Sequence, residues 1–242
     1  MDPRPGIVGR RLEGVKRILA VSGGKGGIGK SSIASVLALW LSGQGLKVGL
    51  LDLDFSGPSD HVLLGAEGLF PSEDKGLIPP EFHGLKFMSI VYFSGNNPTA
   101  LRGHDISNAI IEMLAVTIWD DLDFLIMDMP PGISDATLDV VRLIDRLEYL
   151  VVTIPSRMAR EVGRKELRVL QELNIPVVGV IENMRRVKDP ATDSDLEAFG
   201  VPVLGRIKFD GALEDALGDP RRLLETRFAK AVGRMARNLT AS

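Results

Sequence analysis

A glycine-rich segment, residues 23–32, carries the residue types that bind phosphate groups. It reads Gly-Gly-Lys-Gly-Gly-Ile-Gly-Lys-Ser-Ser and contains the spacing Gly-x4-Gly-Lys-Ser, which begins at Gly24. In such a loop the backbone N–H groups surround a phosphate, because glycines carry no Cβ atom. The lysine reaches the β- and γ-phosphates, and the serine hydroxyl holds Mg2+. The segment therefore predicts a nucleoside triphosphate site with Lys30 as a catalytic cation and Ser31 as a metal ligand.

Two aspartates, Asp52 and Asp54, follow the next apolar segment of the chain. We expect them to diverge, so that one turns toward the phosphates and the other supports the loop. Asp54 is nearer the end of this predicted strand. We therefore expect Asp54 to orient the attacking water and to support the Mg2+ shell.

A third aspartate, Asp128, ends a later apolar segment and is followed by Met-Pro-Pro-Gly. An acidic residue at this place commonly partners a phosphate loop and holds Mg2+, generally through water, because Mg2+ keeps part of its hydration shell. Pro131 and Gly132 belong to a stiff turn, and the glycine N–H is placed to sense a γ-phosphate. We therefore predict Asp128 as a metal ligand and residues 129–135 as a switch loop.

An asparagine, Asn183, lies at the end of the sixth predicted strand, in the sequence Ile-Glu-Asn-Met. Its amide can both donate to and accept from an adenine edge, so we expect it to bind the base. The residues expected to contact the nucleotide come from the loop and from these later segments: Gly24, Lys25, Gly26, Gly27, Ile28, Gly29, Lys30, Ser31, Ser32, Pro131, Gly132 and Asn183.

The elements that must position these residues alternate between strand and helix patterns. Continuous apolar segments predict buried strands at 17–22, 47–54, 85–92, 123–128, 149–154, 176–181 and 201–207. Amphipathic segments predict helices at 31–44, 104–119, 135–145 and 159–173. This alternation predicts an α/β three-layer sandwich, a mainly parallel sheet with helices on both faces. Ligands of such sheets bind at the carboxyl ends of the strands, where the motifs above lie.

Length and composition favour one globular domain. The chain has 242 residues, of which 45% are hydrophobic. We expect residues 1–16, rich in Pro, Gly and Arg, to form a flexible N-terminal arm, and residues 17–242 a single P-loop domain. The net charge of −3 gives no general case for nucleic acid. With no membrane-length apolar run and no visible signal peptide, we expect a cytoplasmic protein.

The motifs, in their order and spacing, resemble those of the Mrp (ApbC-like) family, in the MinD/ParA group of ATPases with a signature lysine. The resemblance covers residues 15–240 and includes the segments 84–90, 101–103, 119–132, 182–184 and 201–205. It implies that Lys25 crosses a homodimer interface to the partner's nucleotide, where it stabilises charge as an arginine finger does. It also implies that Asn183 binds adenine, that the cofactors are ATP and Mg2+, and that the protein serves iron–sulfur cluster assembly.

The chain departs from this family where a cluster would bind. Family members that carry a cluster normally have Cys-x-x-Cys after Glu-Asn-Met, whereas this chain has no cysteine. A [4Fe–4S] cluster needs soft sulfur ligands, which Asp and Lys do not replace. We therefore expect an ATPase switch without its own cluster ligands, as a homodimer or paired with a cysteine-bearing relative or another iron–sulfur maturation protein.

The sequence leaves two other hypotheses about function open. A positioning ATPase of the MinD/ParA type, acting on a membrane or a partner protein, is suggested by the basic amphipathic segment 227–239. A terminal helix docked on its own domain accounts for the same pattern. A regulatory subunit that binds nucleotide without hydrolysis is the third reading, and the presence of Lys25, Asp54 and Asp128 together argues against it.

Overall fold

The computed structural model describes residues 3–55, 57–94, 103–186 and 200–240. Within them a central sheet has the strand order β10-β9-β8-β1-β7-β2-β6-β5. All neighbouring pairs are parallel except β5 and β6. The strands of this sheet are β1 (Val15–Ser22), β2 (Val48–Asp52), β5 (Glu81–Phe82), β6 (Leu85–Ser89), β7 (Leu122–Asp128), β8 (Leu147–Thr153), β9 (Val177–Arg185) and β10 (Val203–Lys208).

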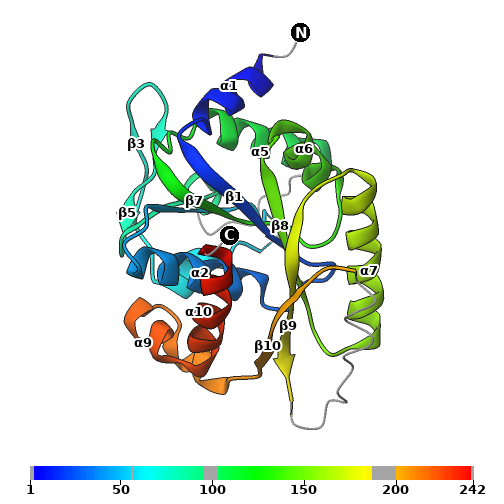
Figure 1. Ribbon diagram of the computed structural model, residues 1–242. Coiled ribbons are helices and arrows are strands. Elements are labelled where there is room, and N and C mark those ends of the chain that lie inside the picture. Colours follow the sequence, from blue (N-terminus) through cyan, green and yellow to red (C-terminus); the bar gives the residue numbers. More distant parts are fainter. Residues whose placement is uncertain (1–2, 56, 95–102, 187–199, 241–242) are drawn as a thin grey trace.

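Helices cover both faces of this sheet (Figure 1). The helices are α1 (Arg4–Arg11), α2 (Lys30–Gly43), α3 (Asp60–Leu64), α4 (Val91–Ser94), α5 (Gly103–Val116), α6 (Asp135–Leu143), α7 (Arg157–Glu172), α9 (Pro220–Glu225) and α10 (Arg227–Thr240), with a 3-10 turn at Gly211–Ala216. A separate hairpin is formed by β3 (Ser72–Glu73) and β4 (Leu77–Ile78). The three-layer α/β sandwich predicted from the sequence is thus confirmed.

The core is divided by the sheet into two apolar clusters. On one face, side chains of α2, α9 and α10 pack against the sheet, among them Ile33, Leu223 and Phe228. On the other face the cover comes from α1, α5, α6 and α7. Strands buried on both faces are apolar at every position rather than at alternate ones, which explains the continuous apolar segments of the sequence.

The N-terminal segment differs from the arm expected at residues 1–16. Residues 4–11 form α1, and Val8 and Leu12 are 0% and 3% exposed in the cluster shared with α5. The first strand begins at Val15, before the expected domain boundary at residue 17. The apolar residues of this short helix are few, which is why its polar composition suggested a loose segment.

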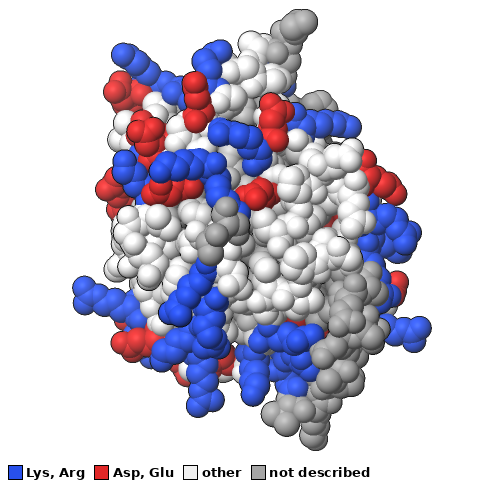
Figure 2. Space-filling view, viewed as in Figure 1, with Lys and Arg blue, Asp and Glu red and all other residues white. Residues whose placement is uncertain are grey.

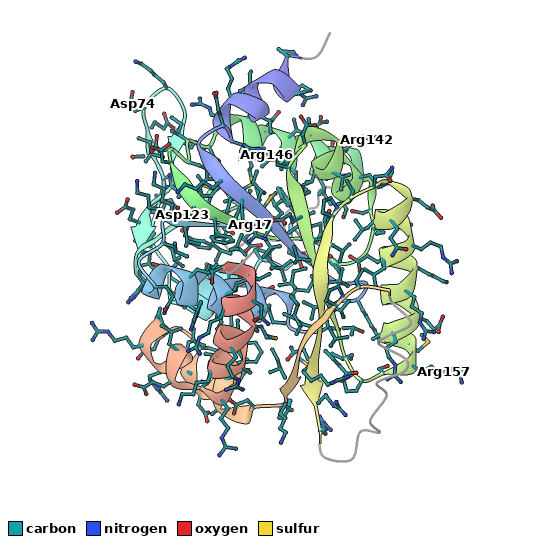
Figure 3. All side chains as sticks on the ribbon, in the orientation of Figure 1. Arg17, Asp74, Asp123, Arg142, Arg146 and Arg157 are labelled. Atoms are coloured by element: carbon teal, nitrogen blue, oxygen red, sulfur yellow. The ribbon has the colours of Figure 1, made fainter. Side chains whose placement is uncertain are left out.

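The C-terminal helix α10 packs against α2 and β10 with its apolar face. Phe228, Val232, Met235 and Leu239 are all buried, so the face that suggested a membrane surface is occupied by the protein's own core. Arg17 of β1, labelled in Figure 3, fixes the end of this helix, because its guanidinium donates to the carbonyl of Leu239. None of the helices in the described residues has the length and apolar character needed to cross a membrane.

Candidate functional site

The phosphate loop, residues 23–32, joins the carboxyl end of β1 to the start of α2. Two of its glycines have positive φ angles, 74° at Gly27 and 86° at Gly29. A side chain at either position would strain the backbone, so the curled loop depends on glycine there. A Cβ atom at Gly26 or Gly27 would meet nothing within 4 Å, so this side of the loop is open. The loop therefore has the shape and the access that a phosphate needs.

Other glycines of the loop are required by close packing. A Cβ atom at Gly24 would overlap Val162 of α7, and one at Gly29 would overlap the Asn183 side chain. The loop is thus held between α7 and the end of β9. The approach of α7 to the loop is a contact that the sequence motif does not reveal.

Asn183 is a buried brace for the loop in this structure. It is 2% exposed, and its Nδ2 atom donates to the carbonyl oxygen of Ile28 at 2.9 Å. One of the two hydrogens of the amide nitrogen is therefore engaged within the protein. The expected contact between Asn183 and the base stays a prediction.

The two loop lysines differ in environment. Lys30 is buried and only 5% exposed, and its ammonium lowers the pKa of both Asp128 and Glu166. Lys25 is exposed on the outer part of the loop. One lysine therefore lies within the domain, and the other is accessible to a second molecule.

Asp52 and Asp54 lie at the end of β2 and just beyond it. Asp52 is fully buried and accepts from the N–H of Asp54 at 3.1 Å and from the Ser89 hydroxyl at 3.1 Å, so it supports the following turn. Asp54 lies beyond the end of the strand and accepts from the N–H of Gly57 at 3.2 Å. The strand predicted at 47–54 therefore ends two residues early, and a strand would not separate the two carboxylates, because alternate residues of a strand share one face.

Asp128 is the register partner of Asp52 on the neighbouring strand. It is fully buried, and neither carboxylate oxygen has a hydrogen-bond partner of good geometry among the described residues. Burial raises the pKa of Asp128 to about 7, although the Ser31 hydroxyl and the Lys30 ammonium act to lower it. Buried polar atoms in proteins are normally paired, so these oxygens are suited to bind a cation.

A further carboxylate, Asp60, belongs to this group and was not singled out in the sequence. It begins α3, is fully buried and accepts from the Ser35 hydroxyl at 2.6 Å. One carboxylate oxygen from each of Asp52, Asp60 and Asp128 lies within 4.8 Å of the others. Burial, followed by repulsion from Asp128 and Asp52, raises the pKa of Asp60 well above its usual range. Its position after the Gly-Pro-Ser turn, six residues beyond Asp54, gave no signal.

The predicted switch loop contacts the phosphate loop directly. The N–H of Gly132 donates to the carbonyl oxygen of Gly23 at 3.1 Å, and the Thr137 hydroxyl donates to the Gly132 carbonyl at 3.2 Å. Gly132 has a φ angle of 76°, which a non-glycine residue rarely adopts. The N–H expected to sense a phosphate is thus already paired with the loop that binds phosphate.

Another buried carboxylate lies on the opposite face of the sheet, on α7. Glu166 of α7 is 1% exposed, and its two oxygens have no hydrogen-bond partner of good geometry among the described residues. Burial raises the pKa of Glu166 to about 7, opposed by the Ser22 hydroxyl and the Lys30 ammonium. Glu166 also contributes to the raised pKa of Tyr149 on β8. Helical periodicity alone does not distinguish such a residue from a solvated glutamate.

Comparison with protein families agrees with this site. Residues 14–218 match the ParA family model described as NUBPL iron-transfer P-loop NTPase. Two relatives named iron-sulfur cluster carrier protein are 42% identical over 177 residues, from Pseudomonas fragi, and 38% identical over 223 residues, from Aquifex aeolicus. These matches cover 72% and 86% of this chain but 62% and 61% of the relatives, so the chain spans only part of their length.

Solved structures show the same fold. A nucleotide-binding protein from Archaeoglobus fulgidus in complex with ADP has a TM-score of 0.74 at 28% identity, covering 97% of this chain and 93% of that one. The cell division ATPase MinD of Pyrococcus furiosus has a TM-score of 0.73 at 20% identity, covering 93% and 99%. Together with the loop geometry, the family match leads to one conclusion: the chain belongs to the ParA family of NUBPL-type iron-transfer P-loop NTPases and has the MinD/ParA fold.

Proposed function

We propose that this chain is a Mg2+-dependent ATPase that acts as a dimeric switch of the Mrp type. The observation that carries the proposal is the phosphate loop itself, with Lys30 buried beside Asp128 and Lys25 exposed at the loop surface. A glycine-rich loop that binds no ligand would need neither the two lysines nor a buried carboxylate without a hydrogen-bond partner next to Lys30.

The residues present fit a Mg2+ ion. The Ser31 hydroxyl acts to lower the pKa of Asp128, so the two groups are neighbours. The carboxylate oxygens of Asp128 are of the type that Mg2+ prefers. Asp54, at the start of the next turn, completes the proposed ligand set, directly or through water. When bound, the ion neutralises charge on the phosphate oxygens. Asp52 and Asp60 accept hydrogen bonds from Ser89 of β6 and Ser35 of α2, so we assign them a supporting role.

The proposed catalytic groups differ in where they come from. Lys30 binds the β- and γ-phosphates from within the domain, and Asp54 orients the attacking water. Lys25 completes the site of the partner subunit in a homodimer, which agrees with its exposure in a single chain. Nucleotide binding and dimer formation are coupled through this residue.

The proposed switch is an exchange of hydrogen-bond partner at Gly132. Its N–H donates to Gly23 in this structure and would donate to the γ-phosphate in the triphosphate state. Release of phosphate restores the contact between the two loops. Thr137, which donates to the Gly132 carbonyl, transmits the change to the first turn of α6.

The cellular role proposed is assistance to iron–sulfur cluster assembly without cluster ligation by this chain. The relatives named iron-sulfur cluster carrier protein motivate this role. The 242 residues contain no cysteine, so thiolate ligands would come from a partner, either a cysteine-bearing relative or another maturation protein. A role as a positioning ATPase of the MinD/ParA type on a membrane is less well supported, because the apolar face of α10 is buried.

Measured turnover tests the catalytic part of this proposal. We expect purified protein to hydrolyse ATP only with Mg2+, and Lys25→Ala to lower kcat at least tenfold. The control Lys165→Ala removes an exposed lysine of α7 that is not among the residues proposed to bind the nucleotide, and it should leave turnover unchanged. Absence of Mg2+-dependent hydrolysis, or equal turnover in Lys25→Ala and wild type, would contradict the proposal.

A further inference from the structure

A strongly basic groove lies outside the nucleotide site, between the edge strand β10 and the helix α10. It has a volume of about 730 Å3. Seven of its lining residues are cationic: Arg185, Arg186, Arg206, Lys208, Arg227, Lys230 and Arg234. Figure 2 shows this concentration of basic side chains over the lower part of the face on which α10 and β10 lie in Figure 1. The charge is therefore local, although the whole chain has a net charge of −3.

Four of these cations, Lys208, Arg227, Lys230 and Arg234, have exposed side chains that a ligand can reach. Asp210 is the one acidic residue among the described lining residues. Its carboxylate oxygens accept from the backbone N–H groups of Ala212 and Phe228, so it caps the segments that follow. Arg185 is near Glu182 at 3.4 Å.

The cations form two rows. Arg227, Lys230 and Arg234 are three and four residues apart on one helix face, and the row spans about 10 Å at 1.5 Å per residue. Arg206 and Lys208 are alternate residues of β10, on one face and about 7 Å apart. Rows with this spacing suit a chain of successive phosphates better than a single anion.

An exposed aromatic ring lies at the end of the strand row. Phe209 is 56% exposed, and the guanidinium of Arg186 lies 5.3 Å from the centre of its ring. An exposed ring costs free energy unless a ligand covers it, and nucleic-acid bases stack on such rings and on guanidinium planes. An acidic peptide would use the cations but has no need of the ring. The apolar face of α10 is buried, and Phe209 is the one large exposed apolar side chain among the described lining residues, which is little surface for insertion into a membrane.

We propose that this groove binds single-stranded nucleic acid, with phosphates along the two cationic rows and a base stacked on Phe209. The net charge of the whole chain gave no reason to expect this partner, because it does not report a local concentration of cations. The inference goes beyond the proposed function and does not depend on ATP hydrolysis. A protein that does not hydrolyse ATP would still bind the nucleic acid. A protein that does not bind nucleic acid would still hydrolyse ATP.

Fluorescence anisotropy with a labelled twelve-nucleotide thymidine strand, dT12, tests the proposal on the full chain. We expect the triple variant Arg227→Ala/Lys230→Ala/Arg234→Ala to weaken binding at least tenfold. The control Lys165→Ala/Arg168→Ala/Arg221→Ala removes three exposed cations outside the groove and should change binding less than twofold. With about three phosphates neutralised, log affinity should fall with a slope of about −2 against log salt.

Two further measurements separate base stacking and partner class. Phe209→Ala should weaken dT12 binding about fivefold or more, and Phe209→Trp should retain it, since stacking on an aromatic ring contributes about 1 kcal/mol or more per base. Polyglutamate of equal charge should compete poorly. The proposal would be overturned if both triple variants lost the same affinity for dT12. It would also be overturned if polyglutamate competed as well as the nucleic acid, or if Phe209→Ala left dT12 binding unchanged. An unchanged circular dichroism spectrum and urea midpoint of the groove variant show that it is folded.

Discussion

Lys30 is the residue around which the charges of the site are arranged. Its ammonium opposes the effect of burial on the pKa of Asp128, on one face of the sheet, and of Glu166, on the other. Both carboxyl groups are buried, and burial raises the pKa of each to about 7. Since a buried carboxylate is costly without a partner, nucleotide-free protein holds these groups partly protonated at neutral pH. A phosphate that draws Lys30 toward it therefore changes the protonation of its neighbours.

The pH dependence of stability follows from these pKa values. Glu166 has a pKa of about 7 when folded against a usual 4.5, so the folded protein keeps a proton that the unfolded chain releases. Its contribution to stability is therefore present below pH 4.5 and is lost as the pH rises to 7. The rise in pKa corresponds to at most about 3 kcal/mol.

Urea unfolding at pH 5 and pH 8 measures this contribution. Glu166→Gln keeps the shape of the side chain but cannot ionise. We expect its free energy of unfolding to rise relative to that of wild type from pH 5 to pH 8. The wild type itself should be less stable at pH 8, because Asp52 and Asp128 also have raised pKa values, about 8 and 7. The same difference between variant and wild type at both pH values would show that Glu166 does not titrate as described.

At the scale of elements, close packing of α10 on α2 depends on one glycine. A Cβ atom at Gly233 would overlap the indole nitrogen of Trp40. The glycine weakens the helix intrinsically by about 1 kcal/mol relative to alanine. It nevertheless lets the two helices approach, so the packing outweighs the helix propensity.

Alanine substitutions at two helical glycines separate these effects. Gly233→Ala should destabilise the protein by about 1–3 kcal/mol, because the added methyl group overpacks the contact with Trp40. The control Gly9→Ala, in α1, adds a Cβ atom with nothing within 4 Å and should be neutral or stabilising by about 0.5–1 kcal/mol. Unfolding in urea checks both. A stabilising Gly233→Ala would mean that α10 does not pack as the structure has it.

The sequence allowed the element order and the phosphate loop to be predicted, because apolar strands and helical periodicity are local signals. It did not reveal α1, whose one buried residue, Val8, together with Leu12 just after the helix, is too little to form a pattern. Asp60 and Glu166 were also missed, since their burial results from tertiary packing by α2 and α7. Asn183 was found, but its bond to Ile28 depends on a contact between distant segments.

At the scale of the whole molecule, the exposed position of Lys25 is the reason to expect a dimer. Every other group proposed to act on the nucleotide belongs to the same chain and is held by its own sheet and helices. A lysine at the loop surface reaches a phosphate most simply in a second subunit that faces the first. The coupling of nucleotide to assembly is therefore the central claim about this molecule.

Light scattering of the Asp54→Ala variant with and without Mg-ATP tests this claim most directly, since slowed hydrolysis should preserve the triphosphate state. We expect the molecular mass to double with Mg-ATP, and the double variant Lys25→Ala/Asp54→Ala to stay at the mass of one chain. A mass that does not change with Mg-ATP, or a dimer that forms equally well without Lys25, would contradict the account.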